Sequence, residues 1–316
     1  MKLLLRSIVT AVSLTIATTG VQAADWAPPG PVKMMIAFGA GGGADTQARL
    51  IAAAMEEKLG WKFIPEQVTG KGGLNMLTAL AQEPADGTAI GMAVTESLGY
   101  NLRAAKTKLT PADFTGLSTT AGFQLAIVGR SSDGWKTMND VIAAAKDGKQ
   151  IRMGTMSPRI EDLAYLLQEA HGVQFNTVGY KGGKKVLDAI NAGDVDVGFV
   201  AGPQGKGVAA GDLLELASAL SVPLNATPDA PLLSDLGVPF NADGQFVFVA
   251  PAGLPAEAQQ AFADAIGDIV TNPEQKVAQI IKRVFGGAQV IKGSDLQSHL
   301  QAGYDGAGEL LKAVVE

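Results

Sequence analysis

The fold is decided by residues 31–45, PVKMMIAFGAGGGAD. The first eight of these residues are mostly apolar and predict a short buried strand, and the glycines after them predict a tight turn that a ligand can approach closely. Apolar residues then recur at helical spacing from Ala48 to Leu59, so we expect a helix with Asp45 as its N-cap. The free N–H groups and partial positive charge of a helix start favour anions. This unit therefore predicts an anion site.

The same alternation of strand and helix continues along most of the chain. Apolar runs predict strands at residues 61–64, 89–94, 125–128, 151–154, 175–180, 195–200, 213–218 and 246–250. Periodic segments predict helices at residues 74–82, 138–146, 160–171, 184–192 and 255–270. This order is typical of an α/β protein with mostly parallel sheets, in which ligands bind at the carboxyl ends of the strands.

Two irregular segments interrupt the alternation and suggest where the chain passes between domains. Residues 101–122 are rich in Thr, Lys and Gly, and residues 221–244 contain four prolines. We therefore expect a discontinuous first domain, residues 24–122 and 225–316, around a second domain, residues 123–224.

Several loops at the expected strand ends carry groups suited to an anion. The turn Gly70-Lys71-Gly72-Gly73 repeats the first arrangement one unit later, and a third glycine turn follows Tyr180 and Lys181. Hydroxyl groups and an arginine stand between the strand at 151–154 and its helix, and arginine binds carboxylates in bidentate fashion. The predicted ligand-binding residues are Phe38, Gly39, Ala40, Gly41, Gly42, Asp45, Lys71, Gly72, Gly73, Thr95, Thr155, Ser157, Arg159, Tyr180, Lys181 and Gly202.

Charge and composition indicate which partners and which compartment to expect. The net charge is −6, and residues 1–23, with two bases, an apolar stretch and small residues near Ala23, have the layout of a secretory signal. Removal of those two bases leaves −8, which disfavours nucleic acid and anionic lipid. The chain has no cysteine and two histidines. We expect an exported, periplasmic monomer without disulfides, cofactor or metal.

An ordered series of motifs resembles the substrate-binding proteins of tripartite tricarboxylate transporters, also called Bug proteins. The series covers nearly the whole chain after the signal and consists of residues 31–49, 70–73, 83–88, 178–183, 191–196 and 250–255. The resemblance implies a two-domain periplasmic binding protein of the Venus-flytrap type, with a hinge of two segments. It further implies that the cleft closes on a small organic carboxylate, that no reaction is catalysed, and that the ligand is delivered to the large and small membrane subunits of the transporter.

The sequence departs from the family at places that bear on the ligand. Gln67-Val68-Thr69 stands where the family usually has Asn-Arg-Pro, and Ser157-Pro158-Arg159 stands near its usual Gly-Ser. Glu96 introduces an acid that either meets a cationic group of the ligand or pairs with Arg103 or Lys106. A dicarboxylate, a tricarboxylate, an aromatic carboxylate and an amino acid all remain open, as do transport and sensing.

The main alternative is an NAD-binding oxidoreductase. Gly39-x-Gly41-x-x-Ala44 fits a dinucleotide fingerprint, and Glu66 stands where a ribose-binding acid is expected. The export signal and the further glycine loops argue against it. No zinc-protease, Gly-x-Ser-x-Gly or P-loop motif is present. A scaffold protein is disfavoured because repeats and heptads are absent.

Overall fold

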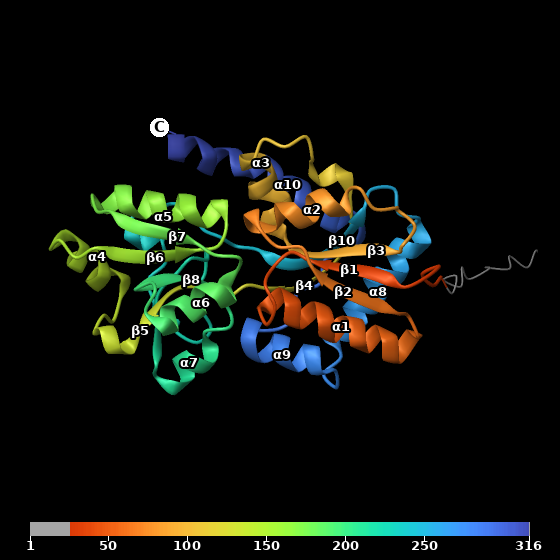
Figure 1. Cartoon of the computed structure of the whole chain (residues 1–316), viewed down its shortest axis with the longest axis horizontal. Helices are drawn as coiled ribbons and strands as arrows, with labels where there is room; N and C mark the ends of the chain where they lie inside the picture. The colour runs from red at the N-terminus through yellow and green to blue at the C-terminus, as the bar shows by residue number, and fades with distance from the viewer. Residues whose placement is uncertain (1–25, 316) are drawn as a thin grey trace, which may run out of the picture.

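The computed structural model describes residues 26–315, so the predicted signal at residues 1–23 lies outside the described part of the chain. Two five-stranded sheets lie end to end (Figure 1). The first has the order β2 (Phe63–Gln67), β1 (Val32–Ile36), β3 (Ala89–Val94), β10 (Gln245–Pro251) and β4 (Phe114–Gly122). The second has the order β7 (Phe175–Gly179), β6 (Ile151–Thr155), β8 (Val197–Ala201), β5 (Leu125–Arg130) and β9 (Leu213–Ser218).

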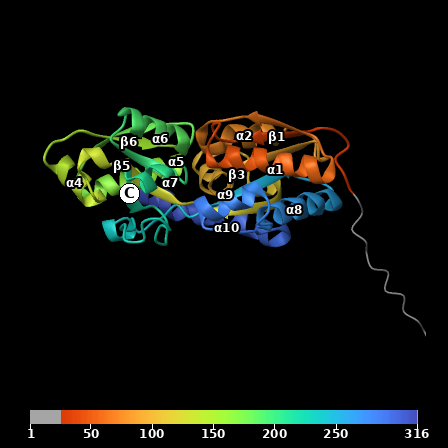
Figure 2. The same ribbon diagram turned by 90° about the horizontal axis from the view of Figure 1, so that it is seen from below.

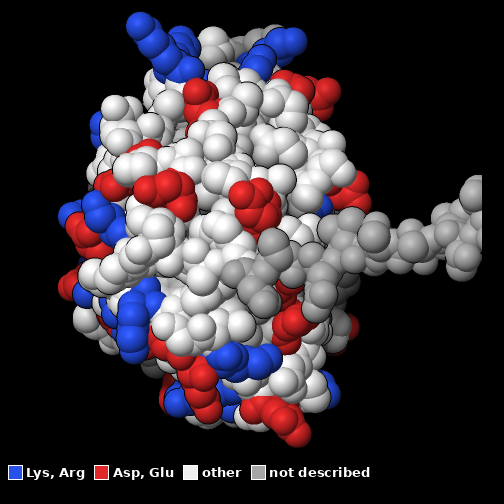
Figure 3. All heavy atoms as spheres, turned by 90° about the vertical axis from the view of Figure 1, so that its right-hand side faces the viewer, with Lys and Arg blue, Asp and Glu red and all other residues white. Residues whose placement is uncertain are grey.

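Helices cover both faces of the first sheet. One apolar core joins its strands to α1 (Gly43–Leu59), α8 (Ala256–Thr271) and α9 (Lys276–Phe285), and another joins them to α2 (Leu74–Leu80) and α10 (Gly293–Val315). A π-helical turn at Ser97–Asn101 and α3 (Leu102–Ala104) follow β3 on the α10 side. Trp26, Trp61 and Phe262 pack as one aromatic cluster, with ring centroids 5.2–5.8 Å apart. Over the outer end of this domain, acidic and basic side chains are interspersed rather than gathered by sign (Figure 3).

The second sheet has α5 (Pro158–His171) on one side and α6 (Gly183–Ala192) and α7 (Gly205–Ala210) on the other (Figure 1). Close approach between α6 and the sheet depends on glycine: a Cβ at Gly154 or Gly198 would lie within 2.7 Å of Val186. Helix α4 (Met138–Lys146) lies at the end of this domain away from the first (Figure 1). The far end of α10 reaches α5, so this helix bridges both domains (Figures 1 and 2).

The prediction of α/β architecture with two packed sheets is confirmed, but the sheets are mixed rather than mostly parallel. β1 pairs in parallel with β2 and β3, whereas β10 runs antiparallel to β3 and β4. The reason lies in the hinge. Because β10 arrives from the other domain, it starts at the edge where β3 ends and must run the opposite way. In the second sheet, β5 likewise arrives from the other domain and runs antiparallel to β8.

Two segments expected to be irregular are more ordered than predicted. Residues 114–122 form β4, in which Ser118, Thr119 and Thr120 are buried. Thr119 bonds through its backbone and hydroxyl to Gln289 and Ile291. The stretch around Leu232 pairs with Ser218 of β9, and the Ala242 amide bonds to the carbonyl of Ala219. The chain therefore returns to the first sheet at about residue 242, later than the expected boundary at 225.

The two connecting segments contact each other. The first crossing lies between Gly122 and Leu125, and the Phe123 amide donates to the carbonyl of Gly244 in the second (3.0 Å). A Cβ on Gly244 would lie 2.5 Å from the ring of Phe123. The hinge is thus a packed pair of segments.

Candidate functional site

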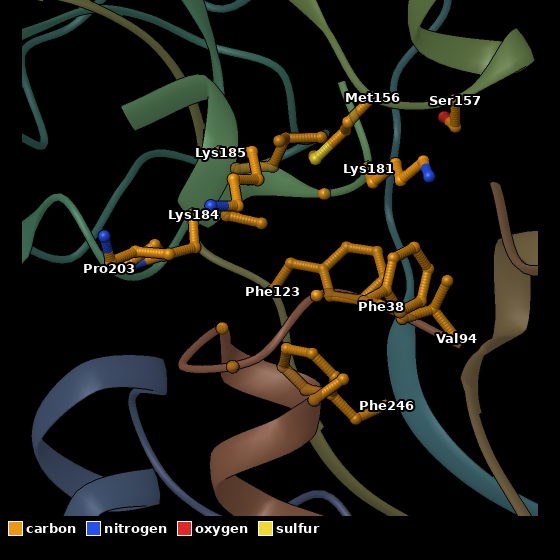
Figure 4. Close-up of a pocket in the computed structure, with 18 of the residues that line it drawn as sticks. Phe38, Val94, Phe123, Met156, Ser157, Lys181, Lys184, Lys185, Pro203 and Phe246 are labelled. Carbon is orange, nitrogen blue, oxygen red and sulfur yellow. The ribbon is translucent and has the colours of Figure 1, made fainter. Parts of the chain in front are cut away.

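A cavity lies between the domains at the carboxyl ends of β1, β3, β6 and β8 (Figure 4). The space between atoms there is about 660 Å³ including open solvent, and about 60 Å³ of it admits the centre of a water-sized sphere, so the two domains leave only a narrow space between them. Its described lining comprises glycines of two helix starts, apolar side chains, three lysines and one acid: Phe38, Gly39, Gly42, Gly43, Ala44, Val94, Glu96, Phe123, Leu125, Met156, Ser157, Lys181, Gly182, Gly183, Lys184, Lys185, Ala201, Pro203 and Phe246.

On the first domain, the cavity meets the start of α1. The N-cap is Gly42 rather than the predicted Asp45, and no side chain caps the helix. Asp45 lies in the first turn, 5% exposed, and accepts from the Gly41 amide (2.9 Å) and from Arg49 Nε (2.8 Å). Asp45 therefore holds the glycine loop through the Gly41 amide and does not cap the helix, so the N–H groups of the first turn stay free to bind a ligand.

On the second domain, the cavity meets the start of α6. Gly182 is its N-cap, with φ 117° and ψ 161°, and again no side chain caps the helix. The Gly39 amide donates to the carbonyl of Lys181 across the cleft (3.3 Å), and a Cβ on Gly39 would crowd that oxygen. Two uncapped helix starts therefore face one space, and this arrangement concentrates partial positive charge there.

The body of the cavity is apolar. Phe38, Phe123 and Phe246 gather on one side and Met156 lies opposite (Figure 4). The rings of Phe123 and Phe246 meet edge to face, 5.3 Å between centroids. Of these four residues, only Phe38 was predicted from the sequence. Phe123 and Phe246 were identifiable only as aromatic residues beside the two predicted domain crossings.

Lysines at the start of α6 lie on one side of this apolar body (Figure 4). Lys181, Lys184 and Lys185 contribute to the lining, and Lys184 forms an ion pair with Asp188. Lys184 follows the first residue of α6 and lies close to the other helix start, because a Cβ on Gly42 would be 3.8 Å from its Cβ. The site thus combines positive charge with an apolar interior, a combination suited to organic anions.

The second glycine loop lines an adjacent cavity instead. Lys71, Gly72 and Tyr180 share that space with Ser157 and Lys181, which border both cavities. The carbonyl of Gly72 accepts from Ser97 Oγ (2.7 Å) and Asn101 Nδ2 (2.9 Å). The predicted convergence of the first two glycine loops is therefore partial.

Several predicted residues have other surroundings. Arg159 donates to the carbonyls of Asn241 and Asp243 and so holds the return crossing. Thr95 accepts from the Gln245 amide (3.1 Å) beside the hinge. Three more predicted residues do not line the cavity. Thr155 is fully buried, Gly73 packs on Ser97, and Gly202 packs on Phe285. Ala40 and Gly41 belong to the first loop but do not line the cavity.

A hydrogen bond outside the cavity also joins the domains. The hydroxyl of Tyr100, in the π-helical turn, donates to the carboxylate of Asp162 in α5. Burial and this bond raise the pKa of Tyr100. Burial also raises the pKa of Asp162, which the bond from Tyr100 partly offsets. The contact therefore links the two sides of the cleft through a partly buried carboxylate.

Two negative findings concern residues 26–315. Within this range no cluster of three His, Asp or Glu residues is placed to hold a metal ion. The helices of this range also lack a segment both long and apolar enough to cross a membrane.

The model of the tripartite tricarboxylate transporter family receptors matches residues 47–290. The chain belongs to this family. A curated relative, the UPF0065 protein of the ttuE-ttuC' intergenic region of Agrobacterium vitis, is 31% identical over 200 residues, which are 61% of this chain and 57% of that protein. The chain thus spans little more than half the length of that relative. Family membership favours the receptor interpretation over the dinucleotide-binding enzyme.

Solved structures with the same fold include two from Rhodopseudomonas palustris. One, described with adipate, is 24% identical with a TM-score of 0.76, and the match covers 91% of this chain and 98% of that one. The other, MatC with bound malate, is 21% identical with a TM-score of 0.77, covering 90% and 99%. At these identities the likeness establishes the two-domain fold.

Proposed function

We propose that this protein captures a small organic carboxylate between its two domains. The observation that carries the proposal is the meeting of two uncapped helix starts, those of α1 and α6, across a largely apolar cavity with lysines at its margin. The helix starts and lysines would bind the carboxylate, and the phenylalanines would cover the carbon skeleton. The malate and adipate described for two structural neighbours are compatible with this class.

Capture with micromolar affinity needs several favourable contacts at once. A micromolar dissociation constant needs about −8 kcal/mol. An anion at a partly buried helix start gains up to ~2 kcal/mol, and covering one large apolar group adds ~1.5–3 kcal/mol. Two helix starts and one covered apolar group together contribute at most about 7 kcal/mol. Charge-assisted hydrogen bonds, which contribute ~1.5–3 kcal/mol each, must therefore supply the rest and offset the cost of ordering the ligand.

The biological role follows from the family and is likewise a proposal. The protein would be exported after removal of residues 1–23, act as a monomer in the periplasm, and deliver its ligand to the large and small membrane subunits of a tripartite tricarboxylate transporter. It would catalyse no reaction and use no cofactor. Closure would be a hinge movement about residues 122–125 and 240–245.

The test is isothermal titration of the exported form with aliphatic and aromatic mono-, di- and tricarboxylates, amino acids and NAD. We expect at least one carboxylate to bind with a dissociation constant in the micromolar range. The variant Lys184→Glu should weaken that binding about tenfold or more, since a like charge costing ~1.4 kcal/mol corresponds to a factor of ten.

The matched control is Lys276→Glu, which makes the same charge change at the exposed first residue of α9, outside the cavity. It should leave the affinity unchanged. Binding of NAD alone, or equal losses in both variants, would overturn the proposal.

A further inference from the structure

Glu96 is the one acid among the described residues that line the cavity. It follows the carboxyl end of β3, next to the strand that carries Phe246, and is 7% exposed. One oxygen, Oε1, accepts from Asn101 Nδ2 (3.0 Å). A carboxylate this deeply buried beside apolar rings loses most of its hydration, so it needs compensating partners.

Within residues 26–315, Glu96 forms no ion pair and no second hydrogen bond. Neither cation considered from the sequence supplies one. Arg103 lies over the ring of Tyr304, 5.2 Å from its centroid, and Lys106 forms no ion pair within the described range. Glu96 also borders a neighbouring cavity that Arg159 lines, but Arg159 donates to the carbonyls of Asn241 and Asp243 and forms no ion pair with Glu96. The second oxygen, Oε2, thus has no partner among the described residues and is available to a ligand group.

We propose that the ligand carries an ammonium group that binds Glu96, so that the protein selects amino-substituted carboxylates with an apolar body. This inference rests on the proposed function. The carboxylate lies at the starts of α1 and α6, the ammonium group at Glu96, and the carbon skeleton against Phe38, Phe123 and Phe246. The arrangement of positive helix starts and one buried acid is complementary to a zwitterion. For a ligand that is only anionic, the same acid is repulsive.

Glu96 also has a structural contact that an experiment must separate from recognition. Asn101 Nδ2 donates both to Glu96 and to the carbonyl of Gly72, so Glu96 helps to hold the second glycine loop. Loss of that support would weaken all ligands alike. Loss of ammonium recognition would weaken only those ligands that carry the group.

The experiment is calorimetric titration with matched pairs that differ in the amino group: L-phenylalanine and 3-phenylpropanoate, L-leucine and 4-methylpentanoate, L-glutamate and glutarate. In the parent protein, we expect the amino member of at least one pair to bind at least tenfold more tightly than its partner. In Glu96→Gln, which keeps an acceptor for Asn101, that ratio should fall to about one or reverse.

The control is Glu215→Gln. Glu215 is also 7% exposed, but both of its oxygens already accept hydrogen bonds, from Gln204 and Thr227, and it does not line the cavity. Its ratio should equal that of the parent.

The outcomes separate the two proposals. Tighter binding of the amino-free members by the parent, or an unchanged ratio in Glu96→Gln, overturns the role of Glu96 and leaves carboxylate capture intact. Failure of every pair and every other carboxylate to bind overturns both. Because the ratio in the parent is informative by itself, an unstable variant does not prevent a decision.

Discussion

Replacement of Tyr100 by phenylalanine should weaken ligand binding although Tyr100 does not line the cavity. Its hydroxyl donates to Asp162 across the domain boundary. A hydrogen bond to a charged group contributes ~1.5–3 kcal/mol. Asp162 is partly exposed, and solvent screening reduces the contribution of this bond to ~1–2 kcal/mol. If the closed form loses that amount, affinity falls about 5- to 30-fold, since each 1.4 kcal/mol is tenfold.

The assay is titration at pH 7.5 with the best-binding carboxylate, together with thermal unfolding to confirm that the variant is folded. The matched control is Tyr165→Phe, which removes a hydroxyl from an exposed tyrosine on the same helix as Asp162. It should leave affinity unchanged. Equal affinity in both variants would refute the reasoning, because the bond between the domains would then contribute nothing to the closed form.

Three further predictions concern stability. Gly182→Ala places a side chain at φ 117° and ψ 161°, and should lower the free energy of unfolding in urea by ~1–3 kcal/mol; an unchanged midpoint would contradict this. Glu161→Gln should raise the Tm at pH 7 but not near pH 4, because burial and the charge of Asp162 raise the pKa of Glu161. An acid with a raised native pKa contributes stability at low pH that is lost as pH rises through that pKa. Asp196→Asn should behave oppositely. Burial acts to raise the pKa of Asp196, but hydrogen bonds from Arg152 keep it below its usual value, so this variant should be less stable at pH 7. The deficit should shrink as pH falls through the native pKa, and a deficit independent of pH would count against the assignment.

The regular α/β units were predictable because their signals are local. The strand at Ala89–Val94, the helix at Met138–Lys146 and the strand at Leu213–Ser218 occur with the predicted bounds. Each is an apolar run or a helical repeat bounded by turn residues, so the pattern itself specifies the element. The glycine turn also predicted the start of α6 to within one residue, whereas α1 begins at Gly43, ahead of the predicted N-cap Asp45.

The hinge was not predictable in the same way. β4 reads FTGLSTTAG and shows no alternation of apolar and polar residues. Its buried hydroxyls find distant partners: Thr119 bonds to residues 170 and 172 positions later in the chain, and Thr120 bonds to Gln47, 73 positions earlier. The direction of β10 depends on where the chain re-enters the sheet. Neither the burial of polar residues in β4 nor the direction of β10 can be predicted from a short stretch of neighbouring residues.

The same distinction explains why the candidate site was predicted only in part. A glycine turn before a helix is by itself enough to predict an anion site. The two turns that face each other across the cavity, at Gly42 and Gly182, were both predicted. Which turns meet depends on how the domains close, and the second glycine loop instead directs a carbonyl toward Asn101. The apolar wall comes from Phe123 and Phe246, which flank the crossings. Residues beside a hinge contact both domains, so Phe123 and Phe246 are well placed to form a wall of the cavity between them.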